Sequence, residues 1–239
     1  TTENICLKTK TKKERKKEHL KKYGIETRVL SNGFKIVLKR LESPRIYAGL
    51  IVACGPLHEP AEKRGISHFL EHLVGEEGKI RNANSRLLYK IARDGGDMDQ
   101  ETGEQYTVYE LNAVSQFWYR DLKMFLNLIA ELNFSKDNFF NEQARVTAEI
   151  AEDSAMDIVI RGRLFGNHRL SCEIYGTKDS VALITPQDIC GWHRKFYRSQ
   201  MMMLVIVGDV EMGKVARAVR ASKINSLEDK EKIEPLKKI

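Results

Sequence analysis

Cysteine is scarce in this chain of 239 residues, and its four cysteines are scattered: Cys6, Cys54, Cys172 and Cys190. No two of them form a CxxC pair, which argues against a zinc site built from cysteine. Scattered thiols in a chain of this length are typical of reduced, mostly buried residues in an intracellular protein, so we expect a cytoplasmic location.

Long hydrophobic runs are also missing. The N-terminus has no apolar stretch of the kind found in signal peptides, and no apolar run in the sequence approaches 18 residues. We therefore expect neither a signal peptide nor a transmembrane helix. Hydrophobic residues make up 42% of the chain and charged residues 31%, which is ordinary for a globular protein of one sizeable domain or two small ones.

Aromatic residues are absent from the most basic part of the chain. Residues 8–22 hold nine Lys or Arg against two Glu, and the first aromatic residue after them is Tyr23. Because no aromatic side chain interleaves the charges, the base-stacking pattern of a nucleic-acid groove is missing, and we expect no nucleic-acid partner. We interpret residues 1–24 as a solvated basic arm; contact with nucleic acid or an acidic membrane surface is the alternative.

The hydrophobic pattern predicts an α+β fold with a mostly antiparallel sheet and helices packed on one face, because runs of strands are followed by runs of helices. The turn Asn32-Gly33 between two apolar runs is a strong hairpin signal. We place the folded domain at residues 25–222 and a charged tail or linker at 223–239. Strands are expected at 27–30, 34–40, 46–53, 106–114 and 201–207, and helices at 66–74, 84–93, 115–133, 135–156, 185–197 and 211–221.

The pentapeptide His68-Phe69-Leu70-Glu71-His72 is the strongest chemical signal in the sequence. This pattern, H-x-x-E-H, is the reverse of the better-known H-E-x-x-H. On a helix, His68 and His72 share one face and can bind a single zinc ion, with Glu71 beside it. A catalytic zinc site keeps three protein ligands and one open position, so a third ligand must come from elsewhere in the chain.

Two histidines and a glutamate within five residues also arise by chance on an exposed helix. The neighbours of this motif argue for a buried helix, because they are apolar at a spacing that faces a core. Ionisable side chains near a core need partners, and a metal ion supplies one for all of them. The apolar neighbours are Ile66, Phe69, Leu70, Leu73 and Val74.

A second pair of carboxylates, Glu142 and Glu149, is spaced two helical turns apart. H-x-x-E-H followed by E-x₆-E resembles the insulinase, pitrilysin and mitochondrial processing peptidase family. The similarity runs in order through roughly residues 27–215. Its further matches are Leu30-Ser31-Asn32-Gly33, Gly55, Glu59, Gly65-Ile66-Ser67-His68, Gly95-Gly96, Thr102, Thr107-Val108-Tyr109, residues 176–185 and Val207-Gly208-Asp209-Val210.

The resemblance implies a role for each residue of the two motifs. His68, His72 and Glu149 match the three ligands of the family's zinc ion, one per chain, and Glu71 matches its general base. Glu142 matches a second carboxylate near the site, whose role is to support a ligand from behind.

The resemblance also implies a place for the peptide substrate. Asp99, Gln100 and Glu101 align with the edge strand on which the family lays its substrate by β-addition. Asp99-Gln100 stand where the family usually has Asn-Ala. The acidic side chains clustered at 97–104 favour basic peptides, and a solvated acidic loop explains the same cluster equally well.

Family enzymes resemble two related halves that face each other around a closed chamber, and only the first half carries zinc. This sequence holds one half, so either it was cut from a longer protein or the second half is a separate polypeptide. We favour a separate polypeptide, and expect a zinc-dependent endopeptidase for small or unfolded peptides that needs a complementary half-subunit, in a heterodimer rather than a homodimer. The alternative is a non-catalytic peptide-binding or scaffold subunit of the same fold. Such members typically lose a ligand or the base, whereas this sequence keeps all four residues. A binder of nucleic acid or membrane surfaces through the basic arm is the third hypothesis.

Three histidines lie outside the motif in the folded part of the chain. His58 and His168 are expected in structural or solvent-facing roles. We predict that His193 forms a cluster on a helix surface with Trp192 and Tyr197.

Overall fold

The computed structural model describes residues 20, 22–75, 83–152, 155–166, 168–171 and 174–227. Most of the basic arm predicted at 1–24 lies outside these residues, as do Cys6, Cys172 and the tail from residue 228. Within the described part of the chain, every helix is too short or too polar to span a membrane.

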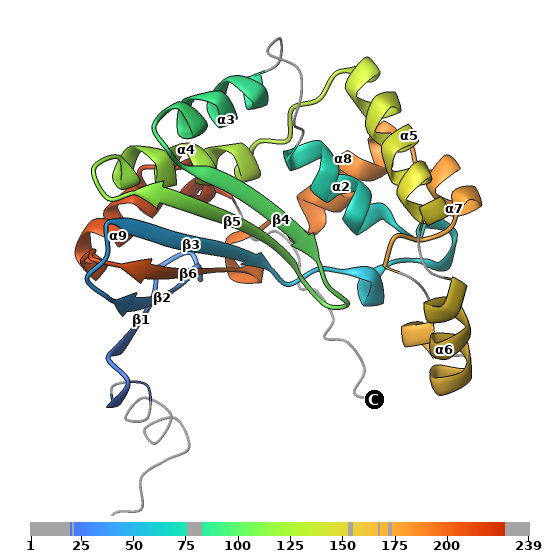
Figure 1. The fold of residues 1–239 in the computed structure, drawn as a ribbon, viewed down its shortest axis with the longest axis horizontal. Coiled ribbons are helices and arrows are strands. Elements are labelled where there is room, and N and C mark those ends of the chain that lie inside the picture. The colour runs from blue at the N-terminus through green and yellow to red at the C-terminus, as the bar shows by residue number, and fades with distance from the viewer. Residues whose placement is uncertain are drawn as a thin grey trace, which may run out of the picture.

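A six-stranded sheet forms one end of the molecule (Figure 1). Its strand order is β1-β2-β6-β3-β5-β4, so β1 and β4 are the two edges. The pair β2–β6 is parallel and the other four pairs are antiparallel, which confirms the mostly antiparallel sheet. The strands are β1 (Ile25–Val29), β2 (Lys35–Arg40), β3 (Arg45–Val52), β4 (Asp97–Thr102), β5 (Thr107–Val114) and β6 (Met202–Gly208).

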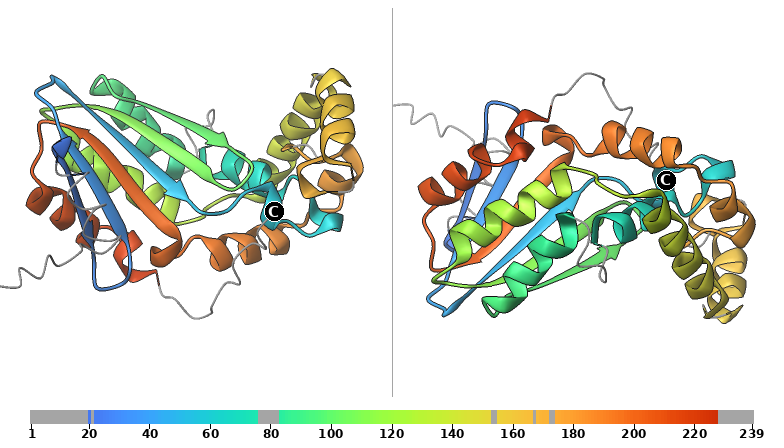
Figure 2. Two further views of the ribbon diagram at one scale, coloured as in Figure 1. Left: turned by 90° about the horizontal axis from the view of Figure 1, so that it is seen from below. Right: turned by 90° about the horizontal axis from the view of Figure 1, so that it is seen from above.

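Helices cover one face of this sheet, as predicted. Figure 2 shows α3 (Ala83–Arg93), α4 (Trp118–Ala130) and α9 (Met212–Arg220) on the same side, with the strands uncovered when seen from below. Side chains alternate accordingly along β6, where Leu204 and Ile206 are fully buried and their neighbours are half-buried. The period of two places one apolar row in the core and leaves the other on the open face.

The remaining helices gather at the other end of the molecule (Figure 1). There α2 (Ile66–Gly75) contacts β4, β5, α5 and α8. The other helices there are α5 (Lys136–Glu152), α6 (Ala155–Phe165), α7 (Lys178–Ala182) and α8 (Pro186–Phe196). Short 3₁₀ turns are η1 (Pro56–His58), η2 (Ala61–Lys63), η3 (Arg169–Ser171), η4 (Ser199–Met201) and η5 (Lys223–Ser226).

Local signals in the sequence explain several element boundaries. The hairpin between β1 and β2 turns at Gly33, whose φ of +82° is a conformation that favours glycine. Thr185 caps α8 by accepting a hydrogen bond from the Asp188 amide, and Pro186 occupies the first turn. Ser135 likewise accepts from the amide of Asn138 at the start of α5.

Other boundaries differ from the predictions. The predicted helix at 115–133 begins only at Trp118, because residues 115–117 form a turn that returns the chain from β5. Helices α6 and α7 were not predicted as separate elements. β4 was expected only from the family resemblance, because the polar sequence Asp-Met-Asp-Gln-Glu-Thr carries no apolar alternation.

Candidate metal centre

The helix α2 presents the H-x-x-E-H motif from inside the molecule. Phe69, Leu70 and Leu73 are fully buried and fix the helix in the core, and His68 and Glu71 of the motif are each only 5% exposed. The N-terminus of α2 is held by Glu59, whose two carboxylate oxygens accept hydrogen bonds from the amides of Gly65 (2.7 Å) and Ser67 (2.8 Å). Because these amides lack intrahelical partners, the buried Glu59 carboxylate satisfies them and fixes the direction of α2.

Three donor atoms from α2 and α5 converge on one point. The Nε2 atoms of His68 and His72 are 3.1 Å apart, and Oε2 of Glu149 lies 3.5 Å from the first and 3.2 Å from the second. Two atoms bound tetrahedrally to zinc at about 2.0–2.1 Å lie roughly 3.3 Å apart. The three separations therefore fit one metal ion, and in the described part of the chain these residues form the group able to hold one.

The two imidazoles differ in their protonation. Burial, with a contribution from the charge of His72, lowers the pKa of His68 to about 3, so its ring is neutral, as a metal ligand must be. Burial also opposes the charged form of His72, but its hydrogen bond to Glu142 and the charges of Glu149 and Glu71 outweigh that effect and raise its pKa. A cation in the centre would replace the proton that these carboxylates attract.

Glu142 supports His72 from the side away from the triad. Its Oε2 lies 3.2 Å from Nδ1 of His72, and its other oxygen accepts from Arg145 at 3.3 Å. Metal-bound histidines usually donate their second ring N–H to a carboxylate in this way, which fixes the ring and its tautomer. His68 differs, because its Nδ1 is buried with no hydrogen-bond partner among the described residues.

Glu71 lies beside the triad and is only 5% exposed. Burial raises the pKa of its carboxyl group to about 7, although a hydrogen bond from Thr102 and the charge of His72 act in the opposite direction. The Thr102 hydroxyl donates to Oε2 of Glu71 at 2.5 Å. The structure thus keeps a carboxylate next to the metal centre in a site where both of its protonation states are accessible near neutral pH.

The predicted peptide-binding residues lie on β4, the outer strand of the sheet beside α2. Asp99 and Glu101 are exposed, and Asp99 faces Glu110 of β5 across the ladder. Gln100 alternates to the other face, where its side-chain amide packs against Gly75 of α2. The three residues are therefore not equivalent, and only the two acids can meet side chains on the open face.

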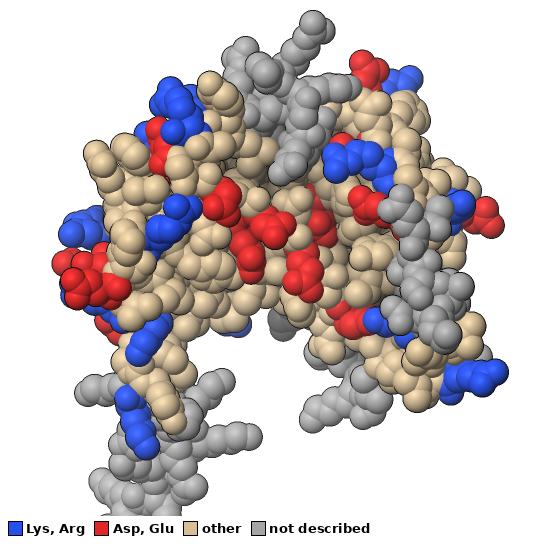
Figure 3. Space-filling model, viewed as in Figure 1, with Lys and Arg blue, Asp and Glu red and all other residues tan. Residues whose placement is uncertain are grey.

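The acidic residues near β4 separate into paired and unpaired groups. Asp97 contacts Arg45 at 3.3 Å, and Glu104 pairs with Arg161 of α6. Among the described residues, Asp99 and Glu101 have no cationic partner. Figure 3 shows Asp and Glu side chains gathered in the middle of the face that carries β4, β5 and the neighbouring end of α2.

The other histidines lie away from the triad. His168 is exposed. His58 is half-buried, packs edge-on against Phe196 and lies 3.2 Å from the Gly55 amide. The prediction of a surface cluster at His193 is wrong, because His193, Trp192 and Tyr197 are all at most 9% exposed.

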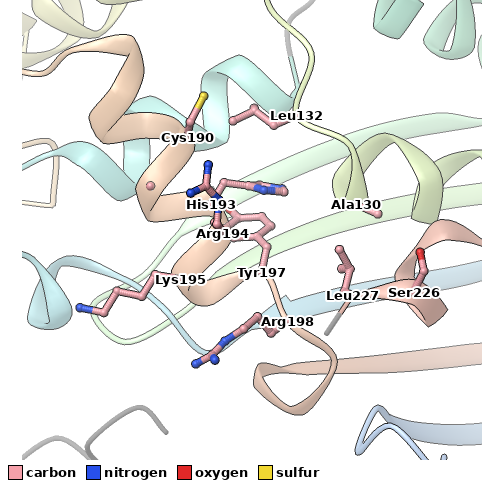
Figure 4. Close-up of a pocket in the computed structure, with 11 residues that line it drawn as sticks. Ala130, Leu132, Cys190, His193, Arg194, Lys195, Tyr197, Arg198, Ser226 and Leu227 are labelled. Carbon is pink, nitrogen blue, oxygen red and sulfur yellow. The ribbon is translucent and has the colours of Figure 1, made fainter. Parts of the chain in front are cut away.

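The cause of this burial is the packing of α8, which turns this side against α2 and the end of α4. The Nε2 of His193 lies 3.0 Å from the Ile129 carbonyl, and Trp192 donates to Ser67 of α2. The outer side of α8 borders a cavity of about 770 Å³ (Figure 4). Cys190, Arg194 and Lys195 line it, and none of the triad residues does.

Comparison with known proteins identifies related sequences of about twice this length. The model of the insulinase family, peptidase family M16, matches residues 35–177, more than half of the chain. A zinc protease of Mycobacterium leprae, itself uncharacterised, is 26% identical over 208 residues, which cover 82% of this chain and 45% of the relative. The zinc protease YmxG of Bacillus subtilis, also uncharacterised, is 26% identical over 185 residues, which cover 75% of this chain and 45% of YmxG.

Solved structures share the fold. A protease from Helicobacter pylori superposes with a TM-score of 0.76 at 24% identity, covering 90% of this chain and 53% of that protein. The first half of the periplasmic protease PqqL from Escherichia coli superposes with a TM-score of 0.75 at 21% identity, covering 90% of this chain and 49% of that protein. An inactive M16 domain from Pseudomonas fluorescens superposes with a TM-score of 0.77 at 18% identity, covering 89% of this chain and 53% of that protein. The chain therefore spans about half the length of these proteins.

Proposed function

The chain belongs to the insulinase family of peptidases, family M16, and we propose that it is a zinc-binding, catalytic half of a peptidase that hydrolyses small or unfolded peptides. The observation that carries this proposal is the convergence of His68, His72 and Glu149 at tetrahedral spacing, with the buried carboxylate of Glu71 beside them. Relatives that are named zinc proteases support zinc as the metal.

The three triad residues would hold one zinc ion, and Glu142 would keep His72 in the orientation that binding requires. Zinc in such a site lowers the pKa of a water molecule and polarises the carbonyl group of the scissile bond. The protein supplies a preorganised position for that chemistry, because α2 is anchored in the core on its apolar side.

Glu71 is the proposed general base. It would take the proton of the attacking water and then deliver it to the nitrogen of the leaving amine. Burial favours the protonated form of this carboxyl group, which helps it to accept a proton from the water. Its position next to His72 in α2 places this carboxylate beside the centre without making it a ligand.

β4 is the proposed docking strand for the substrate. As the outer strand of the sheet it can pair through its backbone with an extended peptide, whereas a folded protein has few free strands to offer. Side chains of the added strand that lie on the open face would meet Asp99 and Glu101. Each opposite-charge pair across strands contributes about 0.2–1 kcal/mol, so Lys or Arg would be favoured at those positions.

We also propose that a second, homologous half completes the enzyme, either in a separate subunit of a heterodimer or homodimer or in a further part of the same polypeptide. The support is length, because this chain covers 45% of its zinc-protease relatives and 49–53% of the solved proteins compared above. A reducing, cytoplasmic setting is a further proposal, supported by the free thiols of Cys54 and Cys190.

A non-catalytic peptide-binding or scaffold subunit is the competing function. The likeness to an M16 domain described as inactive shows that the fold alone does not decide between them. The retention of the three triad residues and of Glu71 in one converging group favours the catalytic proposal.

The deciding experiment is a cleavage assay on quenched-fluorescent unfolded peptides. The zinc-loaded chain would be assayed alone and with homologous half-subunits, alongside Glu71→Gln and His168→Gln as a matched control on an exposed residue. We expect cleavage with a partner, its loss on chelation, its return with zinc, and a strongly reduced rate in Glu71→Gln. Peptide binding without cleavage in every combination would contradict the catalytic proposal and favour the scaffold.

A further inference from the structure

We propose that Thr102 is a positioning residue, whose hydroxyl fixes the base Glu71 and ties its position to the strand that receives the peptide. The inference rests on the proposed function. Thr102 acts through Glu71 and not on the substrate itself.

The contact between Thr102 and Glu71 is short and enclosed. The hydroxyl donates to Oε2 of Glu71 at 2.5 Å, and the two residues are 6% and 5% exposed. Among the described residues, no other group donates a hydrogen bond to Glu71. A buried carboxylate with a single donor depends on that donor for its orientation, since a charge-assisted hydrogen bond is about twice as strong as a neutral one.

The hydrogen bond from Thr102 engages one of the two carboxylate oxygens of Glu71, which affects proton transfer at the other. Because Thr102 occupies Oε2, the other carboxylate oxygen of Glu71 is left to accept a proton. A carboxylate that rotates freely would present either oxygen, or neither, at the position where the proton is transferred. Holding one oxygen therefore raises the fraction of encounters in which the base is correctly placed.

Thr102 is itself held rigidly. It is the last residue of β4 and lies opposite Thr107 in the ladder with β5. Thr107 is buried, and its hydroxyl donates to the Cys54 carbonyl at 3.1 Å, while the turn that follows is closed by a hydrogen bond from the Gly103 amide to the Tyr106 carbonyl. The hydroxyl of Thr102 thus extends from a fixed strand end, which is the support a catalytic group needs.

The same strand carries the proposed peptide-docking edge. Thr102 directly follows Glu101 and is three residues from Asp99, so the docked peptide and the base are positioned by one continuous segment. A shift of β4 relative to α2 would move the docked peptide and the Thr102 hydroxyl together, and so would disturb the hydrogen bond that orients Glu71. This arrangement couples the orientation of the base to the position of the strand that receives the peptide.

The test compares Thr102→Val, which removes the hydroxyl with little change of shape, and Thr102→Ser, which keeps it. Both are assayed in zinc-loaded protein with the partner half, and their folding is checked by thermal unfolding. We expect Thr102→Val to lower kcat roughly ten- to a hundredfold, the loss that follows from removing one hydrogen bond to a charged group. KM should change less than about twofold and zinc content should not change, and Thr102→Ser should restore most of kcat.

Two controls separate this role from a structural one. In the Glu71→Gln background, Thr102→Val should leave both the residual rate and peptide affinity unaltered, because the residue acts only through Glu71. Thr107→Val, which alters an equally buried hydroxyl of the same hairpin, should change stability more than kcat. Equal losses in Thr102→Val and Thr102→Ser, lost zinc, or an unchanged kcat in Thr102→Val would overturn the inference. A wild type that cleaves no peptide would contradict the proposed function itself.

Discussion

The candidate metal triad and the cavity beside α8 are two regions, in the described part of the chain, in which reactive side chains gather. At the triad, His68, His72 and Glu149 place three donor atoms within 3.5 Å of one another. The cavity offers about 770 Å³, yet His193 contacts the Ile129 carbonyl and Figure 4 shows Cys190 and Lys195 pointing in different directions. The comparison teaches that converging donors, and not the volume of a hollow, identify the site of chemistry.

The largest expected difference between the two regions concerns Glu71. Replacing it by Gln should lower kcat by about 10²–10⁴-fold, the usual contribution of general acid–base catalysis, because the amide cannot take the proton of the water. Zinc content should remain, since Glu71 is not one of the converging donors. Steady-state kinetics with metal analysis would check both results, and more than a tenth of wild-type activity would exclude Glu71 as the base.

A smaller effect, on zinc affinity, is expected when Glu142 is replaced on the side of His72 that faces away from the triad. Glu142→Gln should weaken zinc binding about 10–100-fold, the typical cost of removing a carboxylate that orients a ligand. Titration with a competing chelator would measure this, with Glu131→Gln, an acidic residue at the end of α4, as the control. Equal affinity in the two variants would show that Glu142 does not support the ligand.

At α8, a change of pH should alter the free energy of unfolding of the protein and not its metal binding. Burial lowers the pKa of His193 below its ordinary 6.5, so the unfolded chain takes up a proton more readily than the folded one. The contribution of neutral His193 to the free energy of unfolding is fully present above about pH 6.5. It is lost as the pH falls towards the pKa of His193 in the folded protein, by at most about 1.4 kcal/mol for each pH unit. Urea unfolding of zinc-free protein between pH 7.5 and 5.5 should show a steeper loss in wild type than in His193→Gln.

The smallest effects are expected on the lining of the cavity itself. Cys190 and Arg194 are exposed on the outer side of α8. Cys190→Ser and Arg194→Ala should each change the free energy of unfolding by less than about 0.5 kcal/mol and leave cleavage unaltered. A large fall in activity in either variant would instead give the cavity a part in the reaction.

The sequence predicted the convergence of the candidate metal ligands better than the boundaries of the elements around them. The spacing of His68 and His72 on one helix face follows from helical geometry alone, and the apolar residues between them correctly predicted a buried helix. The pairing of α2 with α5 could not be derived from spacing. Glu149 therefore entered the triad only through the family resemblance, and the structure then brought it within 3.5 Å of both rings.

The residues that sequence reasoning missed depend on contacts between distant segments. Nothing in the sequence alone indicated that Thr102 would reach Glu71, 31 positions away, or that Glu59 would hold the start of α2. His193 was placed wrongly because helical periodicity shows which residues share a face but not which neighbour covers it. The hydrophobic pattern alone did not predict β4, because an outer strand with polar residues on its open face lacks the apolar alternation of a core strand.

We propose above all that His68, His72 and Glu149 hold one zinc ion. Elemental analysis of the purified wild type, Glu149→Gln and the control His168→Gln, each dialysed against the same zinc-buffered solution, tests it most directly. We predict about one zinc per chain in the wild type and the control, and a clear loss in Glu149→Gln. No zinc in the wild type, or equal zinc in all three proteins, would contradict the assignment of the metal centre.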